Sequence, residues 1–209
     1  MDNLLAGMDM KALAWALFPE IAMVVGGLLV LFMGLMAKER SQRRTVALVA
    51  FVLFVVVAVF QVGALRTMGQ SSMSGMVATD AFLHNIYGHS AVVLDGFALF
   101  LKLLITVAAA LAVLMSLRYL DLEDGHSGEY YAFMAFSVFG MYVMCSANDL
   151  VGIYVGLETM ALAIYPLVAY HRRQSGSVEG AMKYFVLGAA GSACLLYGAS
   201  LLYGAAGTL

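Results

Sequence analysis

Four ionisable side chains lie within long apolar stretches of the sequence, where they could carry protons. They are Glu20, Lys102, Glu158 and Lys183. A charged side chain at the centre of a bilayer costs about 2.5–3.5 kcal/mol on insertion scales. An apolar span can insert despite this cost, but stability gives no reason for the charged residue to be there. Carboxylates and amines take up and release protons. The chemistry that these residue types predict is therefore proton transfer inside a membrane.

Glu158 is the strongest of the four candidates. It stands near the middle of the apolar run at 148–170. On a helix it would lie about 13.5 Å from Asp149 and about 18 Å from Tyr170, a depth at which a carboxylate is hard to hydrate. Burial favours its neutral form and a nearby cation favours its charged form, so its protonation would respond to movement of that cation. These features are typical of a proton carrier.

Lys183 follows Glu158 by 25 residues, on the next apolar stretch. A short loop joins the two stretches, so they are expected to form antiparallel neighbouring helices. Axial arithmetic then places the two side chains about 10 Å apart along the membrane normal. Two extended side chains or one bridging water could nearly close that gap. Alternatively, Lys183 extends its ammonium group to the membrane surface.

Lys102 is expected near the middle of its span, about 16 Å along the helix from Ala91. Asp95 lies seven residues earlier on the same face, at an axial distance of about 10.5 Å. That distance is too long for a direct bond but suits a shared water-filled seam. The alternative is a structural ion pair between Lys102 and a neighbouring helix.

Glu20 is the weakest functional candidate, because it directly follows Pro19. Proline at the first helical position and an acid in the first turn are features of an ordinary helix start, where the helix dipole favours negative charge. We therefore expect Glu20 to mark the beginning of the first span.

The composition predicts the elements that must position these residues. The chain has 63% hydrophobic and 11% charged residues, against about 45–50% and about 25% in soluble domains. Such a chain is an integral membrane protein. A bilayer leaves backbone groups no water to bind, so its spans must be helices. We predict a single all-α domain over 1–209, with six spans at about 13–37, 45–65, 91–117, 130–147, 149–170 and 179–203.

Lysine and arginine in the short loops predict the orientation of these spans. On one side lie Lys38, Arg40, Arg43, Arg44, Arg118, Arg172 and Arg173. The other side carries only Lys11 and Arg66. The positive-inside rule places the richer side in the cytoplasm, so the N-terminus is expected outside and 66–90 is expected to form a long outer loop.

Other kinds of site receive little support. Cys145 and Cys194 have no second cysteine or histidine at ligand spacing, and His84 and His89 lack two further ligands nearby. No phosphate-binding or dinucleotide-binding motif is present. With 11 basic and 13 acidic residues, no basic surface is available for nucleic acid. We expect no metal or cofactor in this chain and no nucleic-acid partner.

Several long stretches resemble a known family. They are DGFALFLKLLI at 95–105, the run at 128–170 and the run at 178–208, and LFPE at 17–20 is also similar. The most specific parts are SANDL, IYVGLE and MKYFVLGA. These stretches resemble subunit N of the proton-translocating NADH:quinone oxidoreductase, respiratory complex I, one of its antiporter-like subunits.

The resemblance implies roles for three of the candidates. Glu158 matches a glutamate of the fifth helix in that family, Lys183 a lysine of the sixth and Lys102 a lysine of the third. In the family, such residues belong to a chain of protonatable groups across the middle of the membrane. NADH, FMN, the iron–sulfur clusters and quinone would be bound by partner subunits. The protein would lie in the bacterial cell inner membrane beside other membrane subunits of the complex.

One departure from the family pattern affects the interpretation. Family members are longer and carry further lysines on later helices, whereas this sequence stops at Leu209. It is expected to be either a fragment or a shortened form that holds the first part of a proton path. Two alternatives remain: a subunit of a cation/proton antiporter, and a structural scaffold in which the charges only pair helices.

Overall fold

In the computed structural model of the protein, the regular elements among the described residues are helices, apart from one isolated β-bridge between Val92 and Ala147. The described residues are 17–37, 40–70, 92–93, 95–122, 127–171 and 174–207. The helices are α3 (Phe18–Met36), α4 (Arg40–Gln70), α6 (Gly96–Leu122), α7 (Ser127–Ser146), α8 (Leu150–Val168) and α9 (Ser175–Ala206). Each coincides with one of the six predicted spans, so the predicted fold class is confirmed.

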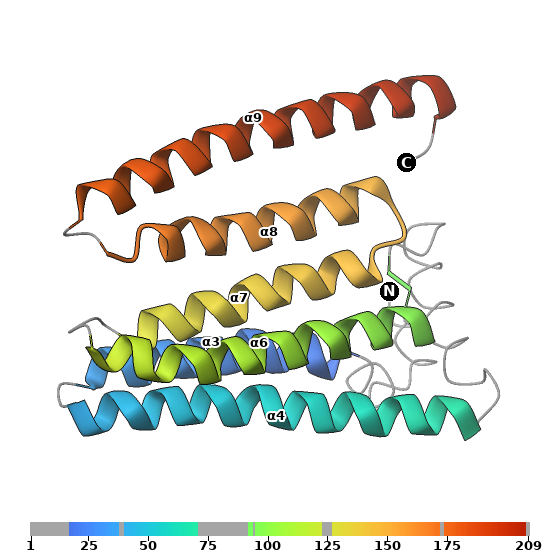
Figure 1. Cartoon of the computed structure of the whole chain (residues 1–209). Coiled ribbons are helices and arrows are strands. Elements are labelled where there is room, and N and C mark those ends of the chain that lie inside the picture. Colours follow the sequence, from blue (N-terminus) through green and yellow to red (C-terminus); the bar gives the residue numbers. More distant parts are fainter. Residues whose placement is uncertain are drawn as a thin grey trace, which may run out of the picture.

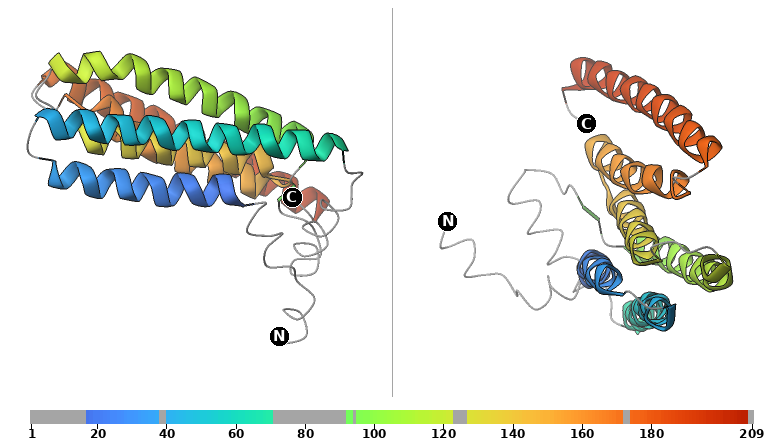
Figure 2. Two further views of the ribbon diagram at one scale, coloured as in Figure 1. Left: turned by 90° about the horizontal axis from the view of Figure 1, so that it is seen from below. Right: turned by 90° about the vertical axis from the view of Figure 1, so that its left-hand side faces the viewer.

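The helices form a bundle that is open on one side, because α8 and α9 extend away from the other helices. Consecutive helices run in opposite directions, and α9, α8 and α7 follow one another in space as they do along the chain (Figure 1). At the other side of α7, the helices α3, α6 and α4 complete a more compact group (Figure 2). Among the described helices, α9 packs against α8 alone, whereas α7 contacts α3, α4, α6 and α8.

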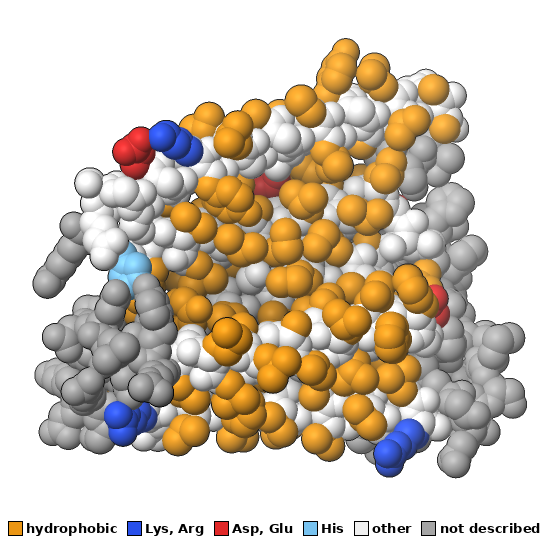
Figure 3. Space-filling model, in the orientation of Figure 1, with side chains coloured by type: hydrophobic (Ala, Val, Ile, Leu, Met, Phe, Trp, Pro, Cys, Tyr) orange, Lys and Arg blue, Asp and Glu red, His pale blue; other side chains and the backbone are white. Residues whose placement is uncertain are grey.

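Five of the six helices are long and apolar enough to cross a membrane; they are α3, α4, α6, α8 and α9. The more polar α7 lies between them, where neighbouring helices rather than lipid cover much of its surface, including Tyr131, Ala135 and Tyr142. Hydrophobic side chains dominate the middle of the molecule, while lysine and arginine lie near the helix ends (Figure 3). This distribution suits a protein that spans a bilayer.

Small residues allow the closest helix crossings. At the crossing of α7 and α8, a Cβ atom added to Gly156 would lie 2.7 Å from the backbone nitrogen of Met144, and one added to Gly140 would overlap backbone atoms of α8. At the crossing of α3 and α7, Gly34 and Gly128 approach each other in the same way. Without a hydrophobic driving force between helices in lipid, such close packing provides much of the attraction.

Three connections have most of the basic residues beside them, and all three lie at the same end of the helices. This end holds the connections between α3 and α4, between α6 and α7, and between α8 and α9 (Figure 1). The helix α4 continues to Gln70, so the beginning of the predicted outer loop is helical. The rest of that loop, including His84 and His89, lies outside the described residues.

Candidate functional site

Lys102 is buried and forms an ion pair with Glu20. Its Nζ donates to Oε1 of Glu20, and the two side chains are 1% and 11% exposed. The helix α3 starts as predicted, with Pro19 at its N-terminus and Glu20 in its first turn. However, Glu20 also points into the bundle and binds Lys102, 82 residues further along the chain. This pair joins α3 to α6.

Three further buried side chains complete a polar cluster around this pair. Thr106 donates from its hydroxyl to Oε1 of Gln61 at 2.8 Å, and Nε2 of Gln61 donates to the hydroxyl of Tyr142 at 3.0 Å. The hydroxyls of Thr106 and Tyr142 also contact each other. The Tyr142 ring centroid lies 6.0 Å from Nζ of Lys102. We call Glu20, Lys102, Thr106, Gln61 and Tyr142 the buried polar cluster.

Asp95 has a local role at the start of its helix. Its carboxylate accepts a hydrogen bond of 2.6 Å from the backbone N–H of Ala98 and so caps the beginning of α6. Among the alternatives for Lys102, the geometry therefore agrees with an ion pair to a neighbouring helix. The partner comes from α3, at the helix start where a purely local role was expected.

Glu158 lies on the side of α8 that faces α9. It shares this face with Tyr165, seven residues along the same helix, and the Tyr165 ring packs against Tyr184 and Phe185 of α9. The Oε1 atom of Glu158 is buried and accepts no hydrogen bond from the described residues. Asp149 caps α8 by accepting a hydrogen bond of 2.5 Å from Gly152, which places Glu158 near the helix centre.

Lys183 lies on the opposite side of α9 from α8. The residues of α9 buried against α8 include Ala181 and Ser192, whereas Lys183 is two residues, or about 200°, around the helix from Ala181. Its Nζ binds Oε1 of Glu179 on the same helix at 2.6 Å, and the Lys183 side chain is 71% exposed. Lys183 therefore forms an i,i+4 pair on an open face.

The structure does not bring Lys183 to Glu158. Tyr165 lies level with residues 184–188 of α9. Because the two helices are antiparallel, Glu158 is level with a point about seven residues further along α9. The axial separation of Glu158 and Lys183 is then about 15 Å rather than the expected 10 Å, and the two side chains lie on different faces.

Sequence reasoning missed most of the buried polar cluster. Gln61 had a usable signal, since it is the only strongly polar residue between Val46 and Val62. For Thr106 and Tyr142 the sequence holds no comparable signal, because threonine and tyrosine occur on any face of a membrane helix. Among the described residues, no group of three or more histidine, cysteine, aspartate or glutamate side chains could hold a metal ion.

Fold and site together define a multi-pass helical membrane protein with ionisable residues buried between its helices. Comparison with known proteins shows which proteins the chain is similar to. The sequence model described as "NADH:quinone oxidoreductase/Mrp antiporter, TM" matches residues 147–209. This segment contains both Glu158 and Lys183.

Relatives described as NADH-quinone oxidoreductase subunit N extend the similarity over most of the chain. NADH-quinone oxidoreductase subunit N of Paramagnetospirillum magneticum is 43% identical over 190 residues, and that of Parvibaculum lavamentivorans is 38% identical over 191 residues. In both cases the alignment covers 91% of this chain and 36% of the relative. The chain is therefore similar, over most of its own length, to part of NADH-quinone oxidoreductase subunit N.

A solved structure has the same fold. A chain in the structure of respiratory complex I from Thermus thermophilus superposes with a TM-score of 0.65 and 22% sequence identity, and the match covers 91% of this chain and 38% of that chain. The protein thus spans a little over a third of the length of the relatives that it matches.

Proposed function

We propose that the protein contributes to proton translocation in the membrane part of an NADH:quinone oxidoreductase, with Glu158 as a proton carrier. One observation carries the proposal: Oε1 of Glu158 is buried in the middle of a candidate membrane span and accepts no hydrogen bond from the described residues. A carboxyl group in this state can bind a proton without breaking an existing bond at that atom.

The lysines have different proposed roles. Lys102 is held by Glu20, so its charge acts as a fixed neighbour within the bundle. Lys183 is exposed on the far face of α9, where it is available to groups outside the described helices. In this proposal a proton that moves at one of the groups Glu158, Lys183 and Lys102 changes the electrostatic potential at the others.

The proposal includes the surroundings of the protein. NADH oxidation and quinone reduction, with FMN and iron–sulfur clusters, take place in partner subunits. The chain lies in the bacterial inner membrane against other membrane subunits of the complex. Support for this assembly comes from the description of the relatives as subunits of NADH-quinone oxidoreductase.

Replacing Glu158 tests the proton role. In membrane vesicles that contain the assembled enzyme, Glu158→Gln is expected to reduce NADH-driven proton uptake at least several-fold, while Glu158→Asp retains part of it. Two measurements serve as controls for folding: the rate at which the enzyme oxidises NADH with a soluble electron acceptor, and the amount of assembled complex. Normal pumping by correctly assembled Glu158→Gln enzyme would remove Glu158 from the path.

A structural role is the second candidate for Lys102. It is favoured by the ion pair with Glu20 and by the hydrogen bonds that surround it. The double variant Glu20→Gln/Lys102→Met separates the two roles, because it removes both charges without leaving either one unpaired. Assembly with normal pumping would assign Lys102 to structure alone, and assembly without pumping would assign it to the path.

A further inference from the structure

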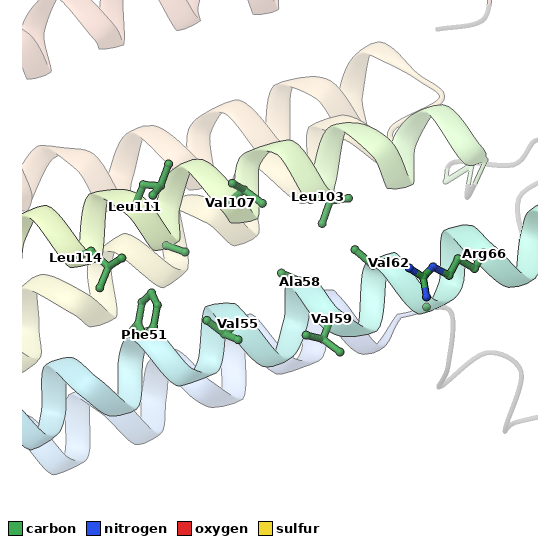
Figure 4. A pocket seen from close by; sticks show the side chains of 12 residues that line it. Phe51, Val55, Ala58, Val59, Val62, Arg66, Leu103, Val107, Leu111 and Leu114 are labelled. Atoms are coloured by element: carbon green, nitrogen blue, oxygen red, sulfur yellow. The ribbon is translucent and has the colours of Figure 1, made fainter.

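A groove of about 620 Å³ runs along the seam between α4 and α6, on the surface that faces away from the bundle. It is lined by twelve residues, of which all but one are apolar or glycine (Figure 4). The exception is Arg66, which stands at one end (Figure 4). The volume falls within the range of about 300–1,000 Å³ that ligand pockets occupy.

We propose that this groove binds one acyl chain of an anionic phospholipid whose phosphate pairs with Arg66. From Phe51 to Arg66 the groove follows α4 for fifteen residues, or about 22 Å. Half of the hydrocarbon core measures about 15 Å. The groove therefore crosses the hydrocarbon half of one leaflet, continues past the midplane and ends at Arg66, the last residue of the candidate span Arg44–Arg66. An arginine at this depth reaches the headgroup region.

The lining favours an acyl chain over a helix from another polypeptide. The groove is bordered mainly by larger side chains, including Val55 and Val59 on α4 and Val107 and Leu111 on α6, and the small residues of its lining are Ala58, Gly63 and Ala110. Helices that associate in membranes use small residues at the contact, because these let the backbones approach. A helix is also about 10–12 Å wide with its side chains. A flexible acyl chain is narrower and fits between the rows of side chains that α4 and α6 present on either side of the groove.

The floor of the groove is held in place by the buried polar cluster. Gln61 and Thr106, which precede the lining residues Val62 and Val107, form the 2.8 Å hydrogen bond between α4 and α6. Both side chains are completely buried. This bond fixes the spacing of α4 and α6 beneath the groove.

The charge of the headgroup follows from Arg66. A guanidinium forms paired hydrogen bonds with phosphate oxygens, which makes arginine suited to phosphate recognition. A zwitterionic headgroup carries its own cation beside the phosphate, so it competes less well for Arg66. The site is expected to prefer phosphatidylglycerol over phosphatidylcholine.

Lipid retention by the protein in its native membrane assembly tests the proposal. The assembly is exchanged into mixed phosphatidylcholine and phosphatidylglycerol, washed in detergent, and its retained lipids are counted by mass spectrometry. Arg66→Gln and the groove-filling Ala58→Phe are each expected to lose about one phosphatidylglycerol per chain. Arg66→Lys should keep most of it.

Matched controls make the result specific. Arg44→Gln removes a charge at the opposite end of α4, and Ala108→Phe adds the same bulk on the exposed surface of α6 outside the groove; both should retain lipid as the native protein does. Equal retention by Arg66→Gln and native protein would overturn the proposal, as would equal loss in the controls. Retained phosphatidylcholine in place of phosphatidylglycerol, or a polypeptide cross-linked to a photoreactive residue at position 59, would also overturn it.

Discussion

The Lys102–Glu20 pair shows how a buried charge is accommodated at the scale of single residues. Each side chain lies almost entirely inside the bundle, where an unpaired charge is costly. The second oxygen of Glu20 is buried without a hydrogen bond from the described residues. The carboxylate is therefore only partly satisfied, and its stability depends on the ammonium group of Lys102.

Removing one partner should be worse than removing both. Lys102→Met leaves Glu20 buried and unpaired, and we expect a loss of about 3–5 kcal/mol in the free energy of unfolding. In Glu20→Gln/Lys102→Met much of this loss should be recovered. Resistance to unfolding by a denaturing detergent, followed by circular dichroism, measures both effects. Equal stability of native protein and Lys102→Met would show that the pair does not stabilise the fold.

At the scale of helices, α7 and α8 are held together by a close backbone approach. Gly140 of α7 lies against the backbone of α8 near Met160, two residues beyond Glu158. Any side chain at this crossing would push the helices apart. The position of Glu158 between α8 and α9 thus depends on a contact on the other side of α8.

The crossing predicts different costs for two glycine substitutions. Gly140→Ala should destabilise the protein by about 1–3 kcal/mol, because its Cβ atom would overlap the backbone of α8. Gly191→Ala, whose Cβ would meet no described atom within 4 Å, should be neutral or stabilise α9 by about 0.5–1 kcal/mol. Thermal unfolding in detergent compares the two. Similar stability of the two variants would contradict a tight crossing.

For the molecule as a whole, the described helices alternate in direction and so bring the basic connections to one end. The position of these basic residues predicts how the protein is oriented in the membrane. All connections at the basic end belong to one side of the membrane, which the positive-inside rule places in the cytoplasm (Figure 1). In that orientation the N-terminal end of α3 and the C-terminal end of α9 are expected at the outer side, and Arg66 with its groove in the outer leaflet.

Accessibility of single cysteines checks this orientation. In a background with Cys145 and Cys194 changed to alanine, a membrane-impermeant maleimide should label Asn148→Cys in right-side-out vesicles. Gln174→Cys, at the other end of α8, should react only in inverted vesicles. Asn148 and Gln174 are exposed between helices. The reverse pattern would invert the molecule, and labelling of both from one side would show that α8 does not cross the membrane.

The sequence alone determined the helices, their membrane character and the candidate charges. These features depend on local patterns: the length of the apolar runs, Pro19 followed by an acid at a helix start, and an acid in the middle of an apolar run. Each is set by neighbours within one or two turns of the chain. For the same reason, Glu158 could be recognised as a buried acid near the centre of its helix.

Only the tertiary structure decided which charges meet. Lys102 and Glu20 are 82 residues apart, and their contact depends on how α3 and α6 are rotated about their axes. A rotation that differs by half a turn places Lys183 on the face opposite α8 rather than beside Glu158. Many rotations of an apolar helix bury similar area in lipid or protein. Close contacts such as that of Gly140 with α8 select among them, and no local pattern reports these contacts.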